Sequence, residues 1–102
     1  MNPPTDSLTA DTALLIRERL AGLTPEAVEV YDESSEHVGH AGARSGGGHY
    51  QLTIVSGQFQ GQPQVARHRM VYAALAGLMG SRIHALAITA WTPEEFERAF
   101  AR

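Results

Sequence analysis

The residues best suited to chemistry in this 102-residue chain are its histidines, because the chain contains no cysteine. Neutral imidazole nitrogens bind transition metals, and an ordinary pKa near 6.5 lets the ring exchange protons at physiological pH. A domain of this size buries about two-thirds of the surface that its unfolded chain exposes, so we expect no large enclosed active site. The five histidines are His37, His40, His49, His68 and His84.

Two of these histidines have a spacing that a metal site could use. His37 and His40 form a His-x-x-His pattern beside the carboxylates of Asp32, Glu33 and Glu36. In the zinc interpretation His37, His40 and one carboxylate bind the metal, and this set is incomplete because a structural zinc site takes four ligands. A solvated polar loop is the alternative interpretation, and the sequence is compatible with both.

The other three histidines fall in predicted regular elements. His68 lies between Arg67 and Arg69, three residues before a core position, which favours a half-buried, hydrogen-bonded side chain. His49 begins a strand and is predicted to be structural. His84 stands where a helix has ended and a strand begins, a position that can expose a side chain on a rigid base. A purely structural role is the alternative for His84.

Absent residues and motifs exclude several classes of chemistry. Without cysteine the chain alone can form no disulfide, no thiolate-ligated metal site and no catalytic thiol. No Gly-x-Ser-x-Gly elbow or Walker-type loop is present, and no predicted helix follows Gly46-Gly47-Gly48, so we expect no enzyme. Eight basic residues, all arginine, against eleven acidic ones give a net charge of −3, which supplies no overall basic excess for nucleic acid.

The N-terminal half of the sequence predicts one helix and one strand before a long loop. Residues 1–7, with two prolines, predict a flexible leader. A helix is expected from Thr9 to about Leu20, a turn over residues 24–26, and a strand over residues 28–32, where apolar and polar residues alternate. Residues 33–48 are rich in Gly, Ser, Glu and His, and a loop of this length is usually functional or disordered.

The C-terminal half predicts a strand–helix–strand unit followed by a short helix. A strand over residues 49–55 places Tyr50, Leu52 and Ile54 on one face. The next helix is expected to begin at Pro63 and run to Met79, and a further strand covers residues 84–90. Residues 92–95, Thr-Pro-Glu-Glu, are typical of a capping box with proline at the first helical position, opening a helix through residue 100.

The element order is α-β-β-α-β-α, which predicts one small α+β domain over residues 8–102, with helices packed against a three-stranded mixed sheet. The first two strands are expected to be antiparallel. The strand–helix–strand unit is expected to be a right-handed crossover with parallel strands. No apolar run has the length of a membrane span and the N-terminus does not look like a secretory signal, so we expect a cytoplasmic protein without membrane partners.

Several groups of residues, in order and at family-like spacing, resemble the BolA family. The resemblance runs from about Leu14 to Trp91 and extends to the element order, because the BolA fold is similar to the type II KH arrangement. The residues that carry the resemblance are Asp32-Glu33-Ser34-x-x-His37, His49-Tyr50, Val55-Ser56-x-x-Phe59-x-Gly61, Arg67-His68-Arg69-Met70-Val71-Tyr72 and Ile83-His84-Ala85-Leu86-Ala87-Ile88.

The resemblance implies a binding protein that pairs with a monothiol glutaredoxin and shares a [2Fe–2S] cluster with it, in iron–sulfur trafficking or iron regulation. The glutaredoxin contributes its cysteine and a bound glutathione thiol, and the BolA partner contributes His84 and one loop residue. Because this chain lacks cysteine, it resembles the histidine-loop type, with His37 at the matching position and His40 as the alternative. Two imidazoles can replace two thiolates on one iron, as in Rieske centres. No cluster is expected in the protein alone.

A second function stays open, because some BolA-like proteins are described as DNA-binding regulators and the KH-like fold offers an analogy. The segment over residues 57–61 occupies the place of the KH loop, but it is not Gly-x-x-Gly and carries no cation. The net charge predicts weak, strongly salt-dependent binding. A local patch of Arg67, Arg69 and Arg82 would be the DNA site, whereas in the glutaredoxin interpretation Arg67, His68 and Arg69 support the fold or contact the partner.

Overall fold

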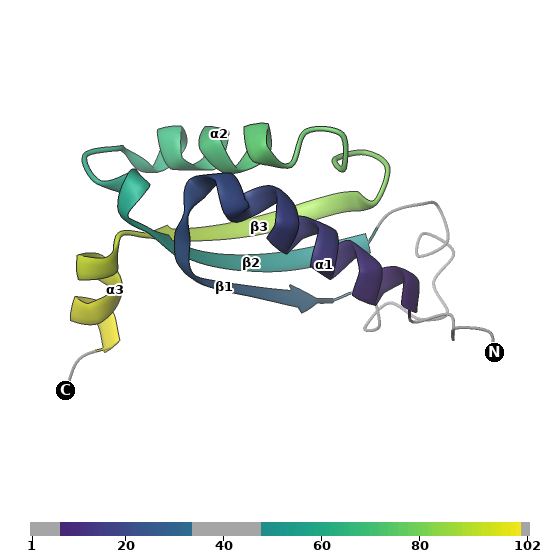
Figure 1. Ribbon diagram of the computed structural model, residues 1–102, viewed down its shortest axis with the longest axis horizontal. Coiled ribbons are helices and arrows are strands. Elements are labelled where there is room, and N and C mark those ends of the chain that lie inside the picture. Colours follow the sequence, from purple (N-terminus) through teal and green to yellow (C-terminus); the bar gives the residue numbers. More distant parts are fainter. Residues whose placement is uncertain (1–6, 34–47, 101–102) are drawn as a thin grey trace.

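The computed structural model describes residues 7–33 and 48–100, which form three α-helices and three β-strands (Figure 1). The order of these elements is the predicted α-β-β-α-β-α, with a short 3-10 turn after the first helix and another after the second strand. The elements are α1 (Ser7–Leu20), β1 (Pro25–Asp32), β2 (Gly48–Ser56), α2 (Gln64–Ala74), β3 (Ile83–Trp91) and α3 (Pro93–Phe100).

The sheet has the order β1-β2-β3 and mixes both kinds of pairing. β1 and β2 are antiparallel, with Val30 opposite Leu52, while β2 and β3 are parallel, with Leu52 opposite Ile88. Parallel neighbours require a crossover, and α2 supplies it. Figure 1 shows α1 and α2 over the sheet and α3 beyond the end of β3. The predicted α+β fold class and strand directions are therefore confirmed.

The hydrophobic core lies between the sheet and the two longer helices. The alternating residues of β2 point into it as predicted, and α1 and α2 each add one apolar stripe. This core fixes the sheet as a rigid base for its exposed residues. The fully buried or nearly buried apolar residues include Ile16, Leu20, Tyr50, Leu52, Ile54, Phe59, Val71, Leu75 and Ile83.

The second helix is shorter than the apolar pattern predicts, and the predicted end at Met79 is wrong. α2 ends at Ala74, and the chain then turns through Gly77 and Gly80, whose φ angles are +95° and +85°. Positive φ is incompatible with a continuing right-handed helix and suits glycine. Leu78 is nevertheless buried, because the turns return it to the core. The apolar residues after Ala74 have a helical spacing in the sequence, but they are buried by turns and not by a continuing helix.

Two further boundaries differ from the prediction. α1 begins at Ser7, two residues before the predicted start. β1 begins at Pro25 instead of residue 28, because the 3-10 turn over Ala21–Leu23 and Thr24, with a φ of +43°, complete the reversal before Pro25. The expected turn over residues 24–26 is therefore wrong. In the described part of the chain, no helix is long and apolar enough to cross a membrane.

Candidate functional site

His84 is the extra residue of a β-bulge at the start of β3. Gly48 of β2 lies opposite Ile83, and the next residue, His49, lies opposite Ala85, so His84 has no counterpart in the register. A bulge of this kind re-aims the side chains that follow it. Ile83 is buried and Leu86 packs against the core, whereas His84 and Ala85 are both exposed. Without the bulge, strict alternation would place His84 on the same face as Leu86, under the helices.

The exposed His84 ring lies against the ring of His49 on the neighbouring strand. The two ring centroids are 5.2 Å apart and the ring planes differ by 21°. His49 is half-buried and alternates with buried Tyr50, which places the His49 ring away from the core. Sequence reasoning had assigned His49 a structural role and missed this contact. Alternation with Tyr50, combined with parallel pairing of the two strands, was the signal that could have found it.

Glu33 and Gly48, the described residues on either side of segment 34–47, both lie beside this histidine pair. The backbone N–H of Glu33 donates to the carbonyl oxygen of His49 at 2.8 Å, and the N–H of Gly48 donates to the carbonyl oxygen of Arg82 at 3.0 Å. The predicted loop ligands His37 and His40 lie outside the described residues. The structure does place both attachment points of their segment at the end of the sheet that carries His84.

Beneath the histidine pair, Tyr50 links β2 to α1. Tyr50 is buried, and burial raises the pKa of its phenol, opposed in part by a hydrogen bond with Thr12. Nη1 of Arg82 also donates to Thr12 Oγ1, at 3.3 Å. The Arg82 side chain is otherwise exposed, so one of the three predicted DNA-contacting cations is held near α1.

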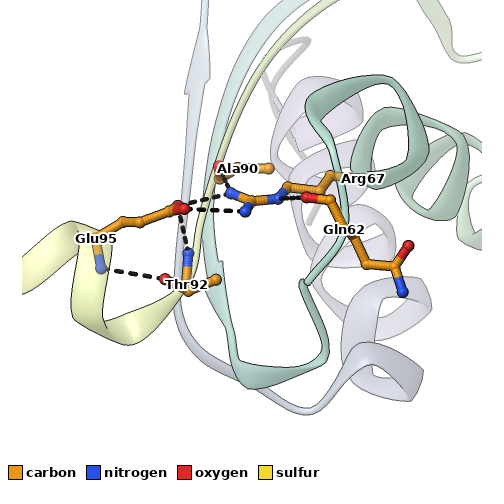
Figure 2. Close-up of polar contacts among 5 residues, drawn as sticks. All are labelled: Gln62, Arg67, Ala90, Thr92 and Glu95. Atoms are coloured by element: carbon orange, nitrogen blue, oxygen red, sulfur yellow. Dashed lines mark hydrogen bonds and ion pairs between the residues drawn. The ribbon is translucent and has the colours of Figure 1, made fainter. Parts of the chain in front are cut away.

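Arg67, in contrast, is a buried fold-stabilising residue at the opposite end of β3 (Figure 2). Its guanidinium donates to the carbonyl oxygens of Gln62 and Ala90 at 2.8 and 3.1 Å, and makes a bidentate ion pair with Glu95 at 2.6 and 2.9 Å. Hydrogen bonds from Arg67 and then from the backbone N–H of Thr92 lower the pKa of Glu95 to about 2. Placing Arg67 in a surface patch for DNA is therefore wrong, because the side chain is 6% exposed and its donors are used internally.

The two neighbours of Arg67 do not join His84 either. His68 is half-buried beside a depression of about 500 Å³ lined by Ile88, Ala90 and Trp91, and Arg69 is exposed on α2. Ala90 lies six residues beyond His84, about 20 Å along an extended strand. The structure therefore brings His84 together with His49 and separates both from the Arg67-His68-Arg69 motif.

Ser56, at the end of β2, fixes the segment over residues 57–61, which the resemblance compares with a KH loop. Ser56 Oγ donates to the carbonyl oxygen of Leu23 and accepts from the N–H of Gln58, while Gln58 Nε2 donates to Thr24 Oγ1. Phe59 is fully buried. These contacts tie the segment to the core. Residues 57–61 carry no cation that could bind a phosphate.

Comparison with known proteins gives a consistent result. A model of the family described as BolA-like protein matches residues 20–95. The chain is 45% identical over 86 residues to SufE-like protein 1, chloroplastic/mitochondrial, of Arabidopsis thaliana, which covers 78% of this chain and 23% of that protein. It is 38% identical over 89 residues to the DNA-binding transcriptional regulator BolA of Escherichia coli (strain K12), with 82% of each chain covered.

The solved structures agree with the sequence comparisons. The BolA domain of SufE1 from Arabidopsis thaliana superposes with a TM-score of 0.69 and 42% identity, covering 82% of this chain and 94% of that one. The molecule is thus a small α+β domain with a mixed sheet whose bulged strand exposes a histidine. The chain belongs to the BolA-like protein family. The description of that family names no reaction.

Proposed function

We propose that this protein is a non-enzymatic partner of a monothiol glutaredoxin, with which it shares a [2Fe–2S] cluster in iron–sulfur trafficking or iron-responsive regulation. The observation that carries the proposal is the exposed His84 in the β-bulge, at the end of the sheet where the segment with His37 and His40 attaches. The resemblance to the BolA family supplies the identity of the partner. The predicted cytoplasmic location stays a prediction.

The residues present fit the proposed cargo. A [2Fe–2S] cluster needs four ligands, and imidazoles can replace two thiolates on one iron. This chain has no cysteine, so the sulfur ligands must come from the glutaredoxin and its glutathione. Among residues 7–33 and 48–100 no group of three histidine or carboxylate side chains could hold a metal ion. In the proposal, His84 would be one ligand and His37 the second, with His40 as its alternative.

The test is an anaerobic titration of a glutaredoxin that carries a glutathione-ligated cluster, followed by visible circular dichroism. We expect a new spectrum that saturates at equal amounts of the two proteins and is lost in His84→Ala. His68→Ala is the matched control, because His68 is a half-buried histidine near the other end of β3. An unchanged spectrum with no complex by size-exclusion chromatography would overturn the proposal.

A second candidate function is DNA binding, favoured by the name of the Escherichia coli relative, a DNA-binding transcriptional regulator. Of the three predicted cations, Arg69 is exposed, Arg82 donates to Thr12 and Arg67 is buried. A gel-shift experiment at several salt concentrations tests this function. Salt-dependent binding that Arg69→Ala weakens would support it, and absence of a shift at low salt would exclude it.

A further inference from the structure

The sheet has two outer strands, β1 and β3, and they differ in how their free edges are protected (Figure 1). A strand with a free edge can pair with another chain, and proteins usually prevent this with charged residues or proline on that strand. β1 contains a proline and three carboxylates in the sequence Pro-Glu-Ala-Val-Glu-Val-Tyr-Asp. β3 contains no proline, arginine or carboxylate in the sequence Ile-His-Ala-Leu-Ala-Ile-Thr-Ala-Trp. The sequence therefore protects β1 and leaves β3 able to pair.

The free edge of β3 presents main-chain groups that β2 does not use. Among the described strands, β3 pairs with β2 alone. Successive residues of a strand turn their N–H and C=O groups to opposite edges. The carbonyl oxygen of Ala90 accepts from Arg67 on α2 at 3.1 Å, so it points away from β2. Ile88 and Leu86, two and four residues earlier, have the same orientation, and the turn after α2 bonds to the edge at Ile83.

A hollow of about 500 Å³ lies along this edge. Ile88 and Ala90 line it from the face of the sheet that the helices cover, while Thr89 and Trp91 line it from the opposite face. Alternate residues of a strand point to opposite faces, so a hollow lined by both sets follows the edge of the strand. The surface that it offers is therefore shaped for an extended chain beside β3.

The flank of α2 beside this hollow is apolar. His68 lines the hollow, so Val65, three residues earlier, and Tyr72, four residues later, lie on the same flank of the helix. These two side chains are 59% and 41% exposed, and both are among the large apolar residues that stay exposed in the described part of the chain. The carboxylate of Glu95 also lines the hollow, but it is paired with Arg67. No unpaired carboxylate among the described lining residues therefore opposes an apolar partner.

We propose that a second copy of this chain covers this surface, with the β3 strands of the two copies paired antiparallel about a two-fold axis beside Ile88. Outward N–H and C=O groups require an extended main chain as their partner, and a two-fold axis lets the same edge serve both copies. In this register Ile88 exchanges hydrogen bonds with Ile88 of the second copy, and Leu86 does so with Ala90 of the second copy. The carbonyl oxygen of Ala90 has two lone pairs, so it can accept from both Arg67 and the second copy.

The side-chain sizes on β3 favour its own copy as the partner. With Ile88 at the axis, Trp91 of one copy lies opposite Ala85 of the other, and Thr89 lies opposite Ala87. Ala85, Ala87 and Thr89 are exposed, and Trp91 is half-buried. Each larger side chain therefore meets a smaller one, and directly opposite side chains are the pairs that stabilise a sheet.

The proposed pairing also explains why one edge is protected and the other is not. The combined sheet has a β1 strand at each edge, and the proline and carboxylates of β1 prevent growth beyond the dimer. The same axis sets the α2 flanks of the two copies side by side, which buries Val65 and Tyr72. This dimer depends neither on a glutaredoxin nor on DNA, so its test uses the protein alone.

The first test is sedimentation equilibrium at increasing protein concentration. We expect the mass to rise from 11.0 kDa to twice that value and to stop there. Ala87→Lys should weaken association at least about tenfold, because the lysines of the two copies meet close to the axis. Ala27→Lys, at an exposed alanine on β1, is the matched control and should leave the association unchanged. Far-ultraviolet circular dichroism checks the folding, and Thr89→Lys replaces Ala87→Lys if that variant does not fold.

Three results would overturn the proposal in this experiment. The first is a protein that stays monomeric up to about 1 mM. The second is a dimer that the lysine on β3 does not weaken, or that Ala27→Lys weakens equally, because the contact would then lie elsewhere. The third is growth beyond the dimer, because the two β1 edges would then not close the assembly.

A distance measurement tests the register directly. The chain has no cysteine, so a single introduced cysteine carries the only nitroxide label in each copy. Neighbouring strands lie about 4.8 Å apart, so one spacing separates the two β3 strands and five spacings, about 24 Å, separate the two β1 strands. Labels on Thr89→Cys should therefore show strong dipolar broadening in the electron paramagnetic resonance spectrum, and labels on Ala27→Cys should not. Broadening of the Ala27→Cys spectrum alone would place β1 at the interface and overturn the proposal.

Discussion

The two ends of β3 use polar side chains in opposite ways. At the C-terminal end, Arg67 is buried and bonded to the carbonyl oxygen of Ala90 and to Glu95, which also caps α3. At the N-terminal end, the bulge leaves His84 exposed with its ring against His49. A permanent charge that is buried away from water needs hydrogen-bond and ion-pair partners within the chain. A neutral imidazole can stand at the surface and keep its nitrogen for an external ligand.

This difference separates two motifs that look equally functional in the sequence. Arg67-His68-Arg69 and Ile83-His84 both contain a histidine, and both belong to the motifs that carry the family resemblance. Only the second exposes a potential ligand on a rigid strand, whereas the arginine of the first connects α2 to β3 and α3. A recognisable motif can therefore stabilise a fold as readily as it can form a site, and burial decides between the two.

The sharpest test of this comparison is to remove the hydrogen bonds and the ion pair of Arg67 at the C-terminal end of β3. Arg67→Ala removes hydrogen bonds to two backbone carbonyls and the ion pair with Glu95, and we expect it to lower the free energy of unfolding by about 2–3 kcal/mol. Arg69→Ala, an exposed neighbour on the same helix, should change it by less than about 0.5 kcal/mol. Urea unfolding measures both. Equal effects of the two variants would show that the buried contacts of Arg67 do not stabilise the fold.

Much of the fold was predictable because it depends on local periodicity. Alternation in β2 identified the buried face with Tyr50, Leu52 and Ile54, and the box of Thr92 and Glu95 identified the start of α3. The parallel pairing followed from the general rule for strand–helix–strand units. The alternation in β2 and the capping box use residues within a few positions of one another, where pattern and structure are directly linked.

The parts that sequence reasoning missed depend on distant partners or on backbone angles. The burial of Arg67 requires Glu95, 28 residues later, and an arginine alone predicts exposure. The bulge at His84 follows from the register between two strands, which side-chain types do not reveal. The end of α2 depends on positive φ at Gly77 and Gly80. The contact between the two histidine rings was therefore only half predictable: His84 from its position, and His49 only from the pairing.

Removal of the cap of α3, at the C-terminal end of β3, should have a smaller effect on the free energy of unfolding. Thr92 Oγ1 accepts from the N–H of Glu95 at 3.1 Å, while Glu95 Oε1 accepts from the N–H of Thr92 at 3.0 Å. Thr92→Ala removes one of these bonds, and we expect a loss of about 1 kcal/mol. Thr92→Ser keeps the hydroxyl and should restore most of the stability in the same urea experiment. Failure of serine to rescue would mean that the methyl group, and not the cap, stabilises α3.

The stability contributed by Glu95, at the start of α3, should also depend on pH in the acid range. The pKa of Glu95 is lowered to about 2 by Arg67 and by the N–H of Thr92, below its ordinary value of 4.5. A lowered pKa means that the stabilisation is complete above the ordinary value and is lost as the pH falls through about 2. We expect Glu95→Gln to flatten the fall of stability over this acid range, as followed by thermal unfolding. Identical pH profiles would show that Glu95 is not the titrating group.

The smallest effect on stability is expected at the N-terminal end of β3, where His84 is exposed. This variant is the strictest test of the comparison between the two ends. His84 is exposed and, as the extra residue of the bulge, adds no side chain to the core, so His84→Ala should change the free energy of unfolding by less than about 0.5 kcal/mol. The cluster spectrum formed with the glutaredoxin should nevertheless be lost. Urea unfolding alongside the glutaredoxin titration of the same variant separates the two quantities. A destabilisation as large as that of Arg67→Ala would mean that the imidazole pair stabilises the sheet, and both ends of β3 would then serve the fold.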